Sequence, residues 1–308
     1  MAGVKVIVVR LQGGLGNQLF QLSAAVVVAN AVDSNEIVLD ASRIAFGTDK
    51  RRRLGLLEFY LLSKNFSLSV WGEKFSLISR IVPQKLGAFL AVSSSETFLR
   101  ARFGKYVEIG DSDDITNLYD PRKTYVLNGY FNDFSLVDRA VNIGFNNKLE
   151  ITPPKSLWLE SRLKNIDFEN SVALHIRLGD YLQFPQIFGR LSQDYYLKAL
   201  EYLKYESRKN LYIFSDQPNI AANEIPMISK MPNCEIVRPP MTASPAEAFY
   251  LLSQFRNLIC ANSTYSMWAA WFNNEQSGVG AKKVVVPSPY LLNKQDIATP
   301  DSWKKLIR

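Results

Sequence analysis

The chain has 308 residues, of which 47% are hydrophobic and 21% are charged, a balance that excludes wholesale disorder and fibrous repeats. This length predicts two domains of roughly 150 residues each. A formal net charge of +7 and a pI near 9.2 favour an anionic partner. Charge alone does not choose among nucleic acid, an acidic membrane face and a phosphorylated small molecule.

The cysteines and the N-terminus bear on redox chemistry and location. Cys234 and Cys260 are too few for a disulfide framework and lack the spacing of a zinc site, so we interpret both as buried thiols. The short apolar run at 6–9 predicts a buried strand, not a signal peptide. No stretch reaches the roughly 18 to 20 apolar residues that span a bilayer. We therefore expect a cytoplasmic protein with at most peripheral membrane contact.

The N-terminal half opens as a parallel α/β unit. The pattern predicts a strand at 4–10, a glycine loop at 12–18, a helix at 19–32 and a strand at 36–40. Between 50 and 114 it weakens into mixed helical stretches, and a strand returns at 124–130. Thr152-Pro153-Pro154 stops regular structure, so we expect domains at 1–154 and 155–308.

In the C-terminal half, strands and helices alternate regularly. Strands are predicted at 171–176, 210–215, 257–260 and 283–286, and helices at 193–205, 245–255 and 266–272. This alternation predicts a doubly wound parallel sheet.

The glycine loop is the first candidate binding element. Gly14 and Gly16 fit the first two glycines of the dinucleotide pattern G-x-G-x-x-G, but Leu19 stands at the third position, and no Lys-Ser/Thr pair makes a P-loop. Small residues after a strand let the backbone approach a ligand, and helix N-terminal amides favour anions. A plain tight turn explains the loop equally well.

The single histidine lies at a predicted strand end. By alternation His175 and Arg177 share one face, at the sheet edge where open α/β folds bind ligands. The alternatives are a structural histidine and a salt bridge between Arg177 and Asp180. One histidine excludes a metal site that needs two imidazoles.

Polar residues also follow two neighbouring predicted strands. Asp216 ends the strand at 210–215, and Asn262-Ser263-Thr264 follows the strand at 257–260 and opens a helix. Hydroxyls and free amides at a helix start form a phosphate cradle, although Ser or Thr here is also an ordinary N-cap.

Two further motifs are rejected as sites. Asp111-Ser112-Asp113 matches the D-x-D motif that holds a metal ion in one class of enzymes, but it lies in a polar loop. The basic run at 50–53 is typical of a solvated surface. We therefore predict no metal site and no cofactor.

Three ordered blocks resemble the α-1,2-fucosyltransferase family. They are 13–21 (GGLGNQLFQ), 175–181 (HIRLGDY) and 262–271 (NSTYSMWAAW), with weaker echoes at 129–131, 195–196 and 214–216. The resemblance implies a GT-B fold, with two Rossmann-like domains facing across a cleft. It also implies a metal-independent, inverting transfer of L-fucose from GDP-β-L-fucose to a sugar hydroxyl, such as the 2-OH of a galactose. The acceptor would be a glycan or oligosaccharide, free or lipid-linked.

The resemblance also implies residue roles. Arg177 would bind the β-phosphate, while His175 and Asp216 would contact the guanine nucleoside. Asn262, Ser263 and Thr264 would hold phosphate oxygens. The N-terminal loop would reach the donor through Asn17, Gly14 and Gly16.

The chain departs from the family pattern at three positions. Leu178 replaces a second arginine, which leaves Arg177 as the main cation; Asn132 replaces a common Gln and Met267 a common Trp. The general base is unassigned, with Asp180 the candidate and Glu247 a weaker one.

Other functions remain open at this stage. One is a nucleotide-sugar-binding protein that has lost catalysis, and another is a transferase with a different donor or linkage. Nucleic-acid binding is disfavoured, because the chain has no reader motif and its basic residues are scattered. Acceptor contacts are expected within 50–133.

Overall fold

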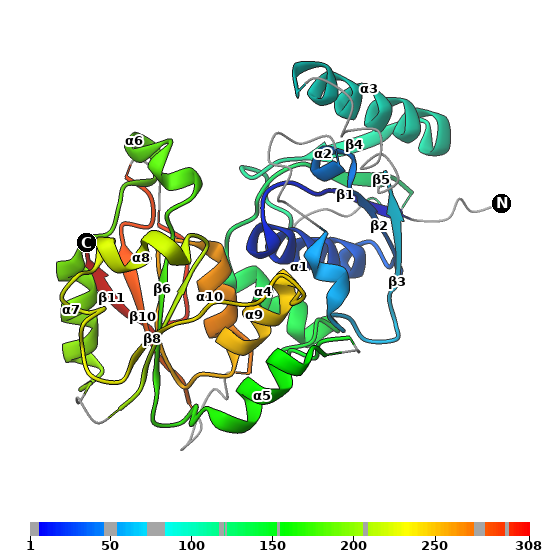
Figure 1. Cartoon of the computed structure of the whole chain (residues 1–308). Coiled ribbons are helices and arrows are strands. Elements are labelled where there is room, and N and C mark those ends of the chain that lie inside the picture. Colours follow the sequence, from blue (N-terminus) through cyan, green and yellow to red (C-terminus); the bar gives the residue numbers. More distant parts are fainter. Residues whose placement is uncertain are drawn as a thin grey trace. The chain divides into compact units, whose positions relative to one another are not determined.

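The computed structural model describes residues 6–45, 54–72, 84–116, 120, 122–152, 155–205, 209–273, 281–292 and 296–308. The chain forms two compact units, Met1–Asn146 and Asn147–Arg308, each built around a parallel sheet (Figure 1). The boundary expected after 154 falls inside the second unit. There the backbone of Asn273 donates to Asn147 O (3.1 Å), and Asn273 Oδ1 accepts from Leu149 N (3.0 Å).

The N-terminal unit contains a five-stranded sheet in the order β3-β2-β1-β5-β4, with all strands parallel. Its strands are β1 (Val6–Arg10), β2 (Glu36–Asp40), β3 (Ser67–Trp71), β4 (Tyr106–Ile109) and β5 (Thr124–Leu127). Its helices are α1 (Leu15–Ala31), α2 (Ser42–Ala45), the 3-10 turn η1 (Gly55–Glu58), α3 (Gln84–Phe103) and α4 (Phe134–Ile143).

Helix α1 begins at Leu15, earlier than predicted. Gly14 is the N-cap in extended conformation, and Gly16 lies buried in the first turn. The helix packs on α4 and β1 and is buried along most of its length. The glycine loop is therefore shorter than expected and ends at Gly14.

Strands β3 and β4, together with α3, occupy the stretch whose pattern was weak. Both strands lie at sheet edges and carry exposed or half-buried residues, so neither shows a clean apolar run. Trp71 of β3 stacks on Phe98 of α3 at 4.2 Å between ring centroids. Tertiary packing therefore defines these elements.

The C-terminal unit has a six-stranded parallel sheet in the order β11-β10-β9-β6-β7-β8. Its strands are β6 (Val172–Ile176), β7 (Leu211–Ser215), β8 (Cys234–Ile236), β9 (Asn257–Ile259), β10 (Lys283–Ser288) and β11 (Lys304–Ile307). Its helices are α5 (Leu157–Asn165), η3 (Asp180–Leu182), α6 (Pro185–Phe188), α7 (Gln193–Tyr202), α8 (Pro218–Glu224), α9 (Pro245–Ser253) and α10 (Thr264–Trp271). The predicted doubly wound sheet is confirmed.

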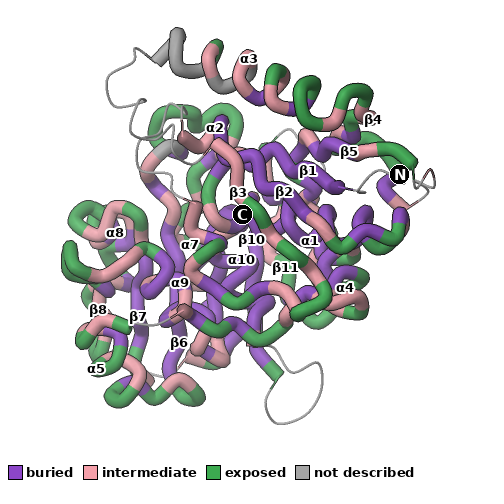
Figure 2. Tube along the Cα trace, turned by 90° about the vertical axis from the view of Figure 1, so that its right-hand side faces the viewer, coloured by how far each residue is buried: buried purple, intermediate pink, exposed green. Residues whose placement is uncertain are grey.

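Burial is concentrated in the central strands of both sheets and in α1 and α10 (Figure 2). Both cysteines are free thiols, Cys260 buried and Cys234 half-buried. Burial raises the pKa of Cys260 to about 12 and that of Cys234 to about 11, so both are protonated at neutral pH. Among the described residues, no helix is long and apolar enough to cross a membrane.

Candidate functional site

The strand order of the C-terminal sheet locates the candidate site. Strand β6 lies between β7 and β9, so connections run outward in opposite directions from this point. Open α/β sheets bind ligands at such a switch point, beyond the carboxyl ends of the strands. Arg177 follows β6, Asp216 follows β7, and residues 260–263 lead from β9 into α10. The structure thus brings these predicted residues to one edge.

Asp216 shapes the loop that follows β6. Its carboxylate accepts hydrogen bonds from Leu178 N (2.9 Å) and Gly179 N (3.0 Å), and Arg177 Nη1 lies 3.1 Å from Oδ2. A Cβ atom at Gly179 would collide with the Asp216 carboxylate, which explains the glycine. These contacts show that the carboxylate organises the loop. They do not involve a nucleoside, so the predicted contact of Asp216 with the nucleoside stays a prediction.

Arg177 remains accessible beside this loop. Its side chain is 27% exposed, and its guanidinium lies over the ring of Tyr181 at 5.7 Å from the centroid. Leu178, by contrast, is 3% exposed and belongs to the hydrophobic core of the unit. Leu178, which stands where the family pattern has a second arginine, therefore points its side chain into the hydrophobic core. The side chain of Asp180 lies outside the described residues, so its predicted role is untested.

Three tyrosine hydroxyls fix the ends of β6 and β9. Tyr195 donates to Cys260 O (2.8 Å), Tyr196 to His175 O (3.2 Å) and Tyr181 to Asn262 O. Burial raises the pKa of Tyr195 and Tyr196, so both stay protonated as donors. The loops of the site are therefore held through their backbone.

His175 is buried beneath the site. It is 3% exposed, and its ring lies 5.5 Å from that of Tyr265 in α10. Burial, followed by the charge of Arg177, lowers the pKa of His175 to about 3. Its Nδ1 is buried and has no hydrogen-bond partner among the described residues. A neutral imidazole with an unsatisfied nitrogen is compatible with the predicted donor contact, and its low basicity makes it a poor general base.

The N-terminus of α10 carries groups that can bind an anion. Ser263 is the N-cap, but its side chain makes no capping hydrogen bond, and its carbonyl accepts from Met267 N (3.2 Å). First-turn amides lack intrahelical acceptors and attract anions. No acidic residue stands in this turn. Thr264 hydrogen-bonds with Tyr290, whose pKa burial raises to about 12. Ser263 is thus better placed than Thr264 for the predicted phosphate contact.

Asn262 has a structural partner set. It is 1% exposed, and its Nδ2 donates to Phe188 O (2.8 Å) and Gly189 O (3.2 Å) at the end of α6. Its amide nitrogen therefore anchors α6 to the switch point. Any contact of this residue with a phosphate would come from other atoms.

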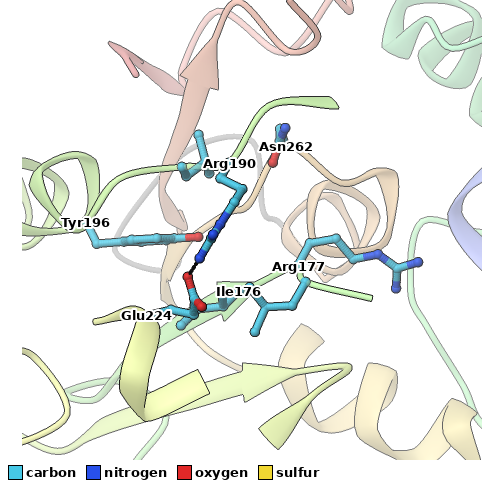
Figure 3. A pocket seen from close by; sticks show the side chains of 8 residues that line it. Ile176, Arg177, Arg190, Tyr196, Glu224 and Asn262 are labelled. Carbon is cyan, nitrogen blue, oxygen red and sulfur yellow. Dashed lines mark hydrogen bonds and ion pairs between the residues drawn. The ribbon is translucent and has the colours of Figure 1, made fainter. Parts of the chain in front are cut away.

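A small pocket lies beside the loop that follows β6 (Figure 3). It is lined by residues of β6 and the loop after it, of the segment between α6 and α7, of α7 and of α8, and by Asn262: Ile176, Arg177, Leu178, Arg190, Leu191, Tyr196, Glu224 and Asn262. Arg190 and Glu224 form an ion pair within it, whereas the guanidinium of Arg177 points away (Figure 3). Because its charged groups are paired with each other and the Arg177 guanidinium points away, we do not assign this pocket to the donor.

In the N-terminal unit, the glycine loop is held from α1. Gln18 Nε2 donates to Gly13 O (3.3 Å), and Gln21 receives Gln12 N on Oε1 (3.2 Å). Gln21 Nε2 also donates to Gly129 O (2.8 Å), which ties the loop after β1 to the loop after β5. Gln18 and Gln21, the two glutamines of the first sequence block (13–21), therefore have structural roles.

Asn17 and the two predicted glycines lie around this turn. Gly13 has φ +78°, and a Cβ atom there would collide with the Asn17 amide. Gly14 is exposed, and a Cβ atom on it would meet nothing within 4 Å. Open space therefore adjoins Gly14, while Gly16 is packed inside the helix. The predicted donor contacts of this loop stay predictions.

The rejected motifs have structural explanations or lie outside the described residues. Asp111 Oδ1 accepts from Tyr130 N (2.7 Å) and Phe131 N (2.6 Å), so it shapes the loop after β5. Glu247 closes the capping box of α9 and accepts from Ser156 N (2.6 Å), which removes it as a general base. The basic run at 50–53 is not described. No group of three or more potential metal ligands occurs in the described part of the chain.

Two open parallel α/β units, the second with cationic and helix N-terminal groups at its switch point, define a glycosyltransferase of the GT-B class. A crystal structure of the NodZ α-1,6-fucosyltransferase soaked with GDP-fucose matches with a TM-score of 0.50 at 12% identity, covering 97% of this chain and 100% of that chain. A glycosyl transferase family 9 protein from Veillonella parvula also gives 0.50, at 11% identity, with 100% and 86% covered. These likenesses concern the fold alone.

The chain belongs to glycosyl transferase family 11, whose model matches residues 101–306. It is 28% identical over 312 residues to the O-antigen biosynthesis glycosyltransferase WbnK of Escherichia coli, covering 96% of this chain and 99% of the relative. It is 25% identical to an α-1,2-colitosyltransferase of Escherichia coli, with 98% and 99% covered. The predicted resemblance to the fucosyltransferase family is thereby confirmed.

Proposed function

We propose that this glycosyltransferase moves L-fucose from GDP-β-L-fucose to a hydroxyl of a glycan, with inversion, forming an α-1,2 linkage. The observation that supports the donor half of this proposal is that Arg177, which follows β6, and the N-terminus of α10, which follows β9, lie at the same edge of the C-terminal sheet. This arrangement suits a diphosphate, because it offers a guanidinium, helix amides and the Ser263 hydroxyl, which makes no capping hydrogen bond.

The chemistry follows from where charge develops. The bond between the sugar C1 and the β-phosphate oxygen breaks, and the acceptor oxygen bonds to C1 from the opposite face while its proton passes to a base. The leaving diphosphate gains negative charge, and the sugar becomes oxocarbenium-like. Arg177 and the first turn of α10 stabilise that charge, a contribution typically worth about 2.7 to 4 kcal/mol for each preorganised donor.

The relatives support the finer assignment. The name of one gives an α-1,2 linkage with colitose as the transferred sugar, and the name of the other gives a role in O-antigen biosynthesis. We therefore propose a glycan acceptor of the surface-polysaccharide kind, either free or lipid-linked. Transfer of colitose is the second candidate, because the colitosyltransferase aligns over nearly the whole chain.

A donor and acceptor screen tests this function. The purified chain is incubated with GDP-fucose and a panel of galactose-terminated oligosaccharides, and the product linkage is determined by NMR. We expect an α-1,2-fucosylated product. Transfer from GDP-colitose alone would establish the second candidate. GDP binding without transfer from either donor would indicate a binding protein that has lost catalysis.

A further inference from the structure

The N-terminal sheet has a switch point of its own. Strand β1 lies between β2 and β5, and a polar side chain follows each of these strands: Gln12 after β1, Arg43 after β2 and Asn128 after β5. Arg43 Nη1 donates to Asn128 Oδ1 (2.8 Å) and to Gln12 Oε1 (3.3 Å). A guanidinium is thus fixed by side chains at the edge where open α/β sheets bind ligands.

The carboxylates around Arg43 have other partners. Arg10 pairs with Glu96 and with Glu108 (2.8 Å), and the second oxygen of Glu108 accepts from Asn128 Nδ2 (2.6 Å). This last bond orients the Asn128 amide so that its oxygen faces Arg43. The positive charge of Arg10 is therefore compensated within the unit.

Asp40, the remaining nearby carboxylate, is also occupied. Its Oδ1 accepts from Ser42 N (3.0 Å), and its Oδ2 accepts from the hydroxyl of Ser95. The hydrogen-bond partners of Arg43 are consequently two neutral carboxamide oxygens. Burial, followed by the charge of Arg10, lowers the pKa of Arg43, while the charges of Asp40 and Glu108 act in the opposite direction.

One edge of the Arg43 guanidinium is available to a ligand. Both hydrogen bonds use Nη1, and within the described part of the chain no hydrogen bond or ion pair involves Nε or Nη2. These two atoms form parallel donors that match two oxygens of one carboxylate or phosphate. A half-buried cation whose hydrogen-bond partners are neutral loses hydration, and an oxyanion compensates that loss better than a neutral hydroxyl.

The loop after β5 adds independent signs of a ligand site. Phe131 has φ +50°, an uncommon conformation for a bulky residue, and Asp111 fixes it through two backbone hydrogen bonds. Beside it, the Oδ1 atom of Asn132 is buried without a hydrogen-bond partner. Tyr130 is 37% exposed, and its phenol lies close enough to influence the Arg43 charge.

We propose that Arg43, held by Gln12 and Asn128, binds an oxyanion carried by the acceptor substrate, so that this enzyme prefers an acidic acceptor. This inference rests on the proposed function in taking the acceptor to be a glycan. The oxyanion has two possible sources: the carboxylate of a uronic acid, or the phosphate at the reducing end of a lipid-linked glycan.

The test measures acceptor binding directly, with GDP present at saturation so that phosphate-bearing probes do not enter the donor site. The probes are methyl β-galactoside, methyl β-galacturonide and galactose 1-phosphate, and titration calorimetry gives Kd. We expect one anionic probe to bind about tenfold or more tightly than the neutral galactoside, as a charge-assisted pair predicts. Preference for the galacturonide identifies a uronic acid, and preference for the phosphate identifies the reducing end.

Two variants assign the effect to Arg43. Arg43→Gln should abolish the preference and leave the Kd for GDP and for the neutral galactoside unchanged. Arg43→Lys should retain part of it, because lysine keeps the charge but not the two-pronged edge. Arg122→Gln, which makes the same change at an exposed arginine paired with Asp120, should keep the full preference.

The outcomes separate this inference from the proposed function. Equal binding of neutral and anionic probes by the native chain would overturn it, as would equal weakening of all probes in Arg43→Gln. A raised Kd for GDP in that variant would instead place Arg43 at the donor. Failure of transfer from GDP-fucose, with the anionic preference intact, would refute the donor assignment alone. Thermal unfolding of each variant verifies that the fold is retained.

Discussion

At the scale of single residues, His175 and Arg177 have opposite environments although they are separated by one position. His175 is buried and neutral, whereas Arg177 is accessible, charged and paired with Asp216. Alternation along β6 predicts a shared face, but the strand ends at Ile176. Arg177 consequently belongs to the loop, where Asp216 sets its direction.

The low pKa of His175 predicts a pH-dependent stability. Its folded pKa of about 3 lies below its ordinary value near 6.5, so between these values the unfolded chain binds a proton that the folded chain does not. Stability is therefore highest above about pH 6.5 and falls as the pH drops, by at most about 1.4 kcal/mol per pH unit from this group. In urea unfolding at pH 7, 5.5 and 4.5, His175→Gln should show a shallower decline than the native chain.

The spectrum of the native chain provides an independent measurement. His175 is the only histidine, so one imidazole signal reports its titration in NMR. We expect that signal to remain in the neutral form from pH 8 to pH 5. Titration near pH 6.5 in the folded protein would contradict the buried, neutral assignment.

For Arg177, the prediction concerns catalysis. Replacement by Ala should lower kcat/KM for GDP-fucose by about 10² to 10³, the typical loss for one preorganised charge stabiliser. Unfolding stability should change by less than about 1 kcal/mol, because the ion pair with Asp216 is partly exposed. Lysine should rescue poorly, since a point charge lacks the planar two-pronged contact with phosphate oxygens.

Arg162→Ala is the matched control. Arg162 in α5 pairs with Glu235 in β8, and its side chain is 28% exposed, against 27% for Arg177. Loss of this ion pair should leave kcat/KM near the native value. A well-folded Arg177→Ala enzyme with normal turnover would remove the residue from the catalytic site.

At the scale of elements, the position of α10 depends on one buried lysine. Lys282 Nζ donates to Ser253 O (2.6 Å), Ala269 O (3.1 Å) and Phe272 O (2.5 Å), and therefore joins the last turns of α9 and α10. Burial lowers the pKa of Lys282 to about 7. In its protonated form the amine is favourable at helix C-termini and satisfies carbonyls that the helices leave unpaired. The same helix presents Ser263 and its first-turn amides at the opposite end.

Lys282→Met should destabilise the fold by about 2 to 5 kcal/mol, because buried carbonyls lose a charged donor. The measurement is chemical unfolding, with Lys283→Met as control, since Lys283 is the exposed neighbour on β10. The control should stay within about 0.5 kcal/mol of the native chain. Similar losses in both variants would show that the three carbonyl contacts contribute little.

Sequence patterns predict buried elements better than edge elements. Strands β6, β7, β9 and β10 were predicted near their observed bounds because each is a buried apolar run between turn signals. Strands β3 and β4 were missed because edge strands carry polar residues and depend on neighbours. Helix α1 was predicted to start too late, because Gly16 and Asn17 suggest a loop although tertiary packing places them in the helix.

The candidate site, like the fold, could be predicted only in part. The sequence identified the residues at the switch point of the C-terminal sheet, since strand ends and helix starts are visible in a pattern. The contacts that hold them were not predictable, because they join distant positions: Asp216 to the amides of Leu178 and Gly179, and Tyr195 to Cys260. Arg43 was missed because its significance depends on Gln12 and Asn128, which no spacing rule connects to it.

At the scale of the whole molecule, the proposed mechanism uses protein groups for the role that a divalent ion has in other transferases. Arg177 and the start of α10 would stabilise the leaving diphosphate. Activity with GDP-fucose should therefore persist in EDTA, measured as initial rate with and without chelator. Modest stimulation by Mg²⁺ is compatible with this, because the ion can relieve inhibition by released GDP. Complete loss in EDTA, restored by Mn²⁺, would contradict it.

The hydroxyls of Tyr181, Tyr195 and Tyr196 all bond to main-chain carbonyl oxygens. A carbonyl is present whatever side chain a position carries, so the scaffold around the donor site is largely independent of the residues displayed on it. Donor selectivity can then change by substitution at displayed positions without rebuilding the loops. For engineering, this identifies the three tyrosines as positions to keep fixed, together with their buried partners His175, Cys260 and Asn262.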